Sequence, residues 1–155
     1  MIYDLEEGDY LGQAREELKR VDHLIFVSLK YTRTVDVLKS VLTRLINCFE
    51  CIIIGVLNDA YEQKKIKEVP PAIIKKCSAL KELYPGKYDE MVNFFIFLRK
   101  VSKAEYEKLS EYRRPVAFIA HTEDEGNIDV NIDVVTEYYR KAQKIMEEII
   151  EKKIT

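Results

Sequence analysis

Two side chains in the last third of the sequence have the types and the spacing for phosphate chemistry. Arg114 and His121 are seven residues apart, close to two helical turns, so in a continuous helix both project from the same face. An arginine can hold a phosphodiester through two parallel hydrogen bonds, and an imidazole can take or give a proton near neutral pH. Arg113 would add a second positive charge for binding the substrate. The pair predicts a phosphate site, provided that this segment is one helix.

Two other groups of side chains have the residue types of a metal site but not the positions. Cys48 and Cys51 have the spacing of half a zinc site, yet they lie among apolar residues inside a predicted helix, which favours two buried thiols. The acidic loop from Glu123 to Asp129 lacks the ligand spacing and the closing glutamate of a calcium loop. We therefore predict no bound metal and no cofactor.

The composition is typical of one helical domain. The chain has 155 residues, of which 47% are apolar and 34% charged, with five glycines and four prolines. Its net charge of -2 gives no global positive field that would attract nucleic acid, although short basic runs such as Arg113-Arg114 remain. The aromatic residues fall on predicted core positions rather than among basic residues. We expect a single all-α domain over residues 1–155.

The cysteines and the hydropathy pattern predict a cellular location. The chain has three cysteines, an odd number, and its first residues are acidic where a secretory leader would be basic. The longest apolar run, from Cys51 to Leu57, is far shorter than the ~20 residues that a membrane span requires. We predict a cytoplasmic protein that makes no membrane contact.

Helical periodicity organises most of the chain around one long segment. Its apolar stripe, sustained for three heptads, consists of Val35, Leu38, Leu42, Leu45, Phe49, Ile52 and Val56. We expect this segment to be the central helix of an up-and-down bundle of about five helices. This central helix is predicted over about 34–62, and further helices over about 10–30, 71–83 and 88–101, and after Asn131. Thr32 or Thr34 would cap the second helix, and Asp129 or Asn131 the last one.

The segment over about 103–121 has two interpretations because it contains Pro115. Either a fifth helix is kinked at the proline, or the helix ends at Arg114 and residues 115–121 form a buried strand. The alternation of Ile128, Val130 and Ile132 is the only other strand signal in the chain. We favour the helix, since the sequence offers no clear partner for a strand.

The segment from Tyr112 to His121 reads Tyr-Arg-Arg-Pro-Val-Ala-Phe-Ile-Ala-His and precedes a short polar loop and a last amphipathic helix. In a helical chain this order resembles the HEPN domain family, small and mostly prokaryotic bundles in which an Arg is followed, after four to six residues, by a His. The resemblance implies a metal-independent domain that cleaves or binds RNA and dimerises with the two motifs facing one another. Arg114 would then hold the scissile phosphate, and His121 would act on the ribose 2′-hydroxyl.

Two departures from the family pattern favour binding over catalysis. The spacing between Arg114 and His121 is at the upper limit for the family, and Pro115 stands where a polar residue is usual. We predict a HEPN-like module that binds nucleic acid or a protein, forms a homodimer, and has RNA, a nucleotidyltransferase or an antitoxin as its partner. One alternative is a toxin-like, metal-independent endoribonuclease that uses Arg114 and His121 in a dimer. Another is an unrelated helical interaction protein of unknown role.

Overall fold

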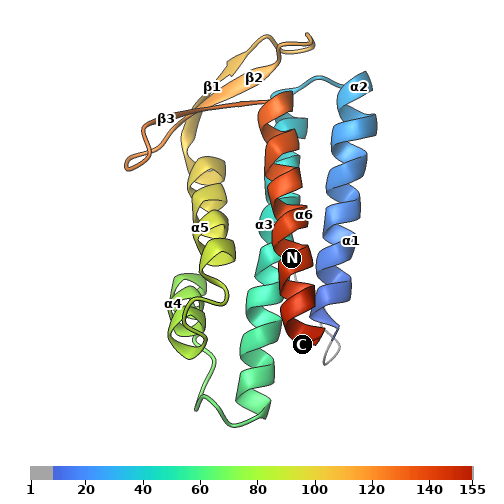
Figure 1. Ribbon diagram of the computed structural model, residues 1–155. Helices are drawn as coiled ribbons and strands as arrows, with labels where there is room; N and C mark the ends of the chain where they lie inside the picture. The colour runs from blue at the N-terminus through green and yellow to red at the C-terminus, as the bar shows by residue number, and fades with distance from the viewer. Residues whose placement is uncertain (1–8, 155) are drawn as a thin grey trace.

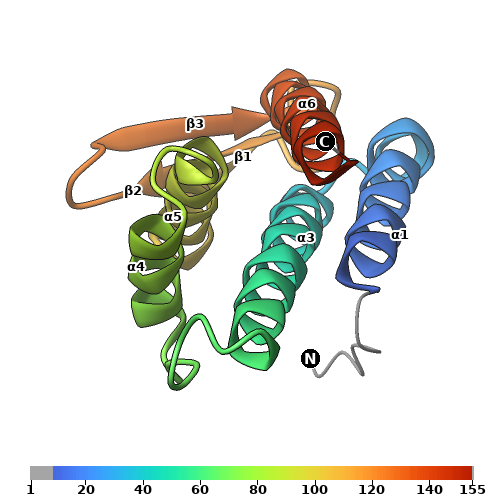
Figure 2. The ribbon, with the colours of Figure 1, turned by 60° about the horizontal axis from the view of Figure 1, so that its bottom comes forward.

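The computed structural model describes residues 9–154, without the side chains of residues 153 and 154, and is mostly helical. Its helices are α1 (Tyr10–His23), continued by a π-helical stretch η1 (Leu24–Ser28) and by α2 (Leu29–Tyr31), then α3 (Val35–Glu62), α4 (Ile73–Leu83), α5 (Asp89–Lys103) and α6 (Ile132–Ile154). Along the chain, α1, α3, α5 and α6 run alternately up and down (Figure 1), and the short α4 lies beside α5 (Figure 2). The expectation of a helical bundle is confirmed in this coarse sense.

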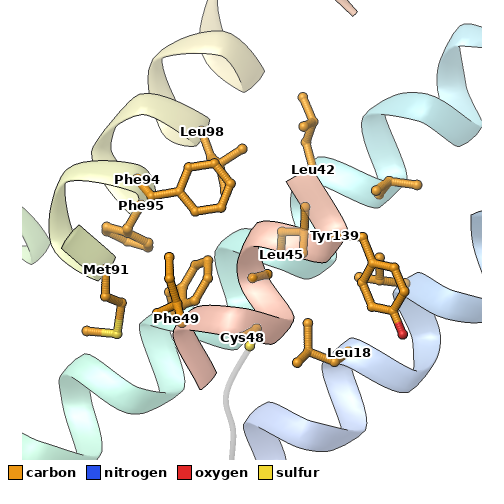
Figure 3. Packing of buried hydrophobic residues seen from close by; sticks show 14 of the residues in the cluster. Leu18, Leu42, Leu45, Cys48, Phe49, Met91, Phe94, Phe95, Leu98 and Tyr139 are labelled. Atoms are coloured by element: carbon orange, nitrogen blue, oxygen red, sulfur yellow. The ribbon is translucent and has the colours of Figure 1, made fainter. Parts of the chain in front are cut away.

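Helix α3 is the centre of the core, as its apolar stripe predicted. It packs against α1, α4, α5 and α6, and half of its residues are buried. Figure 3 shows Leu45 and Phe49 between the side chains of α5 and those of α1 and α6. The Phe49 ring meets the edge of Phe94 with 5.7 Å between ring centroids. Gly55 lets α1 approach closely, because a Cβ atom there would overlap the ring of Tyr10.

The apolarity of α3 is accounted for by this packing. Among the described helices it is the one long and apolar enough to cross a membrane, and 61% of its most apolar stretch is buried in the bundle. A core helix of a small bundle has this composition because it contacts neighbours on nearly every side.

Two predicted helix caps are present. The Thr34 hydroxyl accepts a hydrogen bond of 3.3 Å from the backbone N–H of Val37, and the Asn131 side chain accepts one of 2.8 Å from that of Val134. Helix α4 begins at Ile73 rather than at 71, because Ala72 has an extended backbone and stands at the N-cap position.

Residues 104–121 contain no helix, so the expectation of a helix over about 103–121 is wrong. Three short strands, β1 (Glu105–Leu109), β2 (Ala117–His121) and β3 (Asn127–Asn131), form an antiparallel sheet in the order β1-β2-β3. The strand alternative was correct for β2, and the alternation of Ile128 and Val130 is β3. The missing partner is β1, whose residues carry no apolar alternation. Pro115 lies in the turn before β2, where it costs no ladder hydrogen bond.

The sheet lies across the end of the bundle where α5 ends and α6 begins (Figure 1). Its inner face contributes Phe118, Ala120 and Val130 to the core, all at 0% exposure. Because residues opposite each other in an antiparallel pair share a face, the outer face carries Glu107, Ile119 and Asp129 in one row. The strands are consecutive and antiparallel, so the β1–β2 turn lies at one end of the sheet and the β2–β3 turn at the other.

Candidate nucleic-acid interface

The turn between β1 and β2, residues 110–116, has a defined and unusual backbone. The N–H of Arg113 donates to the carbonyl of Ser110 over 3.1 Å, and the N–H of Val116 donates to that of Arg113 over 3.0 Å. Ser110 and Tyr112 have φ angles of 54° and 66°, a left-handed conformation that is uncommon for residues other than glycine. Such positions persist where the surroundings hold them, and they concentrate at functional sites.

Contacts with the α2–α3 connection hold this turn in place. The N–H of Tyr112 donates to the carbonyl of Arg33 over 2.7 Å. The carboxylate of Glu111 accepts a hydrogen bond of 3.1 Å from the N–H of Val35, the first residue of α3, where the helix dipole favours a negative charge. The turn is therefore fixed against the N-terminus of α3, and Arg113 and Arg114 come to the same end of the molecule as Arg33.

This end of the molecule presents basic and aromatic side chains together. Two tyrosines have the most exposed large hydrophobic side chains of the described residues, Tyr31 at 85% and Tyr112 at 79%. We call the following seven residues the turn surface: Lys30, Tyr31, Arg33, Lys108, Tyr112, Arg113 and Arg114. Five of them are cations, whereas the whole chain has a net charge of -2. The carboxylate of the neighbouring Glu111 accepts the hydrogen bond from Val35 of α3 and lies 3.7 Å from the ammonium group of Lys108.

His121 lies at the other end of β2. Its Nδ1 atom is 2.8 Å from the Asn127 side-chain oxygen, and its Nε2 atom is 3.7 Å from the carboxylate of Glu107. The ring borders a shallow hollow that also contains Lys100 and Asp124. A 2.6 Å hydrogen bond joins these two, and it raises the pKa of Lys100 and lowers that of Asp124. The charges around His121 are therefore of both signs.

The predicted shared helix face of Arg114 and His121 does not exist. Arg114 lies in the turn before β2, and His121 is the last residue of that strand. Because a strand rises about 3.3 Å per residue, β2 alone separates its first and last residues by about 13 Å. A catalytic base must come within about 3 Å of the proton that it takes. The structure thus groups Arg114 with Arg113 and Arg33, and leaves His121 apart from them.

Sequence reasoning missed the aromatic part of the turn surface. It assigned the aromatic residues to core positions, which is wrong for Tyr31 and Tyr112. Each of these tyrosines stands within two residues of an arginine, where a regular segment gives way to a turn. This pairing of tyrosine with arginine outside the helical stripes was the available signal.

The cysteines are buried, as predicted. Cys48, Cys51 and Cys77 are at most 2% exposed, and no group of three His, Cys, Asp or Glu side chains in the described part of the chain is placed to hold a metal ion. Burial raises the pKa of all three thiols, that of Cys51 to about 12.

The raised pKa values predict slow thiol chemistry in the folded protein. Because the thiolate is the reactive form, we expect Cys48, Cys51 and Cys77 to react with a disulfide reagent at pH 8 about 100-fold more slowly than in the unfolded chain. The absorbance of the released chromophore, followed with and without guanidinium chloride, measures both rates. Rapid modification of one thiol in the native protein would contradict the burial described here.

Comparison with known protein families, curated proteins and solved structures finds no match for this chain.

Proposed function

We propose that this protein is a HEPN-like helical domain that binds RNA through the turn surface, as a binding module rather than as a nuclease. The up-and-down arrangement of α1, α3, α5 and α6 supports the HEPN-like assignment, and Arg114 followed after six residues by His121 is the motif that suggested it. The homodimer, the nucleotidyltransferase or antitoxin partner and the cytoplasmic location stay predictions.

The observation that carries the proposal is the grouping of five cations with two exposed tyrosine rings on one fixed surface. Lysine and arginine side chains bind nucleic acid chiefly by neutralising phosphates, and their effect depends on local rather than net charge. Exposed aromatic rings provide faces on which unpaired bases stack, and each stacked base contributes about 1–3 kcal/mol. Tyr31 and Tyr112 supply such faces beside Arg33 and Arg113, and this combination favours a single-stranded nucleic acid as the ligand. RNA is the choice that the HEPN resemblance implies.

The ribonuclease alternative loses its geometric basis in this arrangement. It required Arg114 and His121 to reach one phosphodiester from a common face. In the structure, His121 contacts Asn127 and Glu107 instead, at the far end of the strand. We therefore assign Arg114 to phosphate binding, together with Arg113, and give His121 no part in the proposed RNA contact.

A charge-reversal pair tests this proposal. The protein is titrated into a fluorescein-labelled, unstructured single-stranded RNA, and fluorescence anisotropy is followed at several salt concentrations. We expect Arg113→Glu/Arg114→Glu to weaken binding by at least about tenfold, and the salt slope to fall by about 1.4, since each phosphate contact contributes about 0.7. The physical reason is the loss of two phosphate contacts and the addition of two repulsive charges.

The matched control is Arg15→Glu/Lys144→Glu, which changes the net charge equally. Both residues are exposed and belong to α1 and α6, outside the turn surface. The control should stay within about twofold of the wild type, since its charges contact no phosphate. Equal weakening by both pairs would show that only net charge matters, and an absence of wild-type binding would reject the proposal.

A further inference from the structure

Strand β1 is an edge of the sheet with an open side. It pairs with β2 alone, and in the described part of the chain no strand pairs with its other side. All five of its residues are exposed, whereas β3, the other edge, has Val130 fully buried and leads directly into α6. An edge strand presents backbone N–H and C=O groups that can pair with another extended chain. We define the unpaired side of Glu105–Leu109 as the β1 edge.

The β1 edge carries charged side chains but has neither a proline nor a bulge to prevent pairing. Proline, bulges and inward-pointing charges are the usual devices against pairing with another chain. The strand reads Glu-Tyr-Glu-Lys-Leu and contains no proline, and its five residues pair with β2 in continuous register without a bulge. Lys108 lies opposite Phe118 on the inner face and is the one inward-pointing charge of the strand. The strand is therefore long and regular enough to accept a neighbour.

The charges beside this edge select the kind of neighbour. Glu105 and Glu107 lie on the outer face of the sheet, because their partners across the β1–β2 ladder are His121 and Ile119. Asp129 extends the same row as Glu107 on β3. A strand added at the edge would place its outward side chains directly beside the two glutamates, where opposite charges attract and like charges repel.

We propose that the β1 edge receives a basic, extended peptide segment of a partner protein as a fourth strand of this sheet. Main-chain hydrogen bonds would supply affinity, and side chains at alternate positions would supply specificity. The outward residues opposite Glu105 and Glu107 are lysine or arginine. The inward residue between them faces Tyr106 and is β-branched, since such residues pair well with an aromatic neighbour across strands. This site shares Lys108 with the turn surface, but the proposal does not depend on RNA binding.

A designed peptide tests the proposal without knowledge of the partner. The probe is fluorescein-labelled Gly-Val-Thr-Lys-Val-Lys-Gly-amide, which places lysines opposite both glutamates in an antiparallel register. Binding of the intact protein is measured by fluorescence anisotropy at low salt. We expect saturable binding below about 1 mM, and at least about tenfold weaker binding by Glu105→Lys/Glu107→Lys. Both replaced side chains are exposed, so circular dichroism should show an unchanged fold.

Three controls decide between strand addition and general attraction of charge. The variant Glu62→Lys/Glu147→Lys makes the same charge change at two exposed positions on α3 and α6, and should keep binding within about twofold. Of two probes methylated on alternate backbone nitrogens, one should lose binding because its missing N–H groups are those that face β1. An acidic probe with glutamates for lysines should not bind. Absence of saturable binding, equal weakening by both variants, or full binding by both methylated probes or by the acidic one would overturn the proposal.

Discussion

Replacing Phe49 by alanine should lower the free energy of unfolding by about 3–5 kcal/mol. Phe49 has no solvent exposure and lies in the middle of α3, where its ring meets that of Phe94. The substitution removes the transfer free energy of the ring and leaves a cavity that the surrounding helices fill only in part. Urea denaturation followed by circular dichroism measures the change.

The exposed Tyr61, near the end of the same helix, is the control for this substitution. Its side chain is 50% exposed, so Tyr61→Ala should change the free energy of unfolding by no more than about 0.5 kcal/mol. If Phe49→Ala cost as little as Tyr61→Ala, the core could not be centred on α3 as described.

Removing the two arginines that contact Glu17 should cost about 3 kcal/mol. Glu17 is a fully buried carboxylate on α1. Arg20 and Arg44 donate to its two oxygens over 2.6 and 3.4 Å, so that the contact with Arg44 joins α1 to α3. The double variant Arg20→Met/Arg44→Met keeps much of the packing but leaves a buried charge without these partners. We take the lower end of the usual range because both arginines are partly exposed.

The triple variant that also carries Glu17→Met distinguishes this explanation from lost packing. A buried ion pair that is replaced by apolar residues of similar size is often neutral in stability. The triple variant should therefore recover most of what the double variant lost, in urea denaturation at neutral pH. If the triple variant were as unstable as the double one, the penalty would not come from the buried charge.

The helices could be predicted from the sequence because each carries its own signal. The stripe from Val35 to Val56 repeats at helical spacing, and Thr34 and Asn131 supply capping oxygens at the starts of α3 and α6. These signals lie within a few residues of one another in the sequence, so they can be recognised without knowledge of the tertiary structure. The ends of α4 were less certain, since Pro70-Pro71 permits more than one starting residue.

The sheet was harder to predict than the helices, because each of its strands forms only by pairing with another strand. Residues 105–109 show no apolar alternation. They form a strand because they pair with β2 directly after the end of α5. The spacing of Arg114 and His121 fits two turns of helix equally well, so periodicity alone could not decide. Pro115 was the local signal against the helix, and the alternation of Ile128 and Val130 was the signal for a partner strand.

The arginines of the candidate site were predicted from the sequence, but its tyrosines and its contribution from the α2–α3 connection were not. Arg113 and Arg114 were chosen from the sequence, and the structure places them on an exposed turn. Tyr31 and Arg33 join them because the N–H of Tyr112 bonds to the carbonyl of Arg33, a contact between residues far apart in sequence. No spacing rule could have supplied that contact.

The position of bound RNA is the most direct test of the proposed interface. Backbone amide resonances of the labelled protein are recorded while an unstructured single-stranded RNA is added. We expect the largest shifts at residues 30–34 and 108–114, with little change around His121 and Asn127. Shifts centred on His121, or none at saturating RNA, would contradict the assignment of the turn surface as the RNA-binding site.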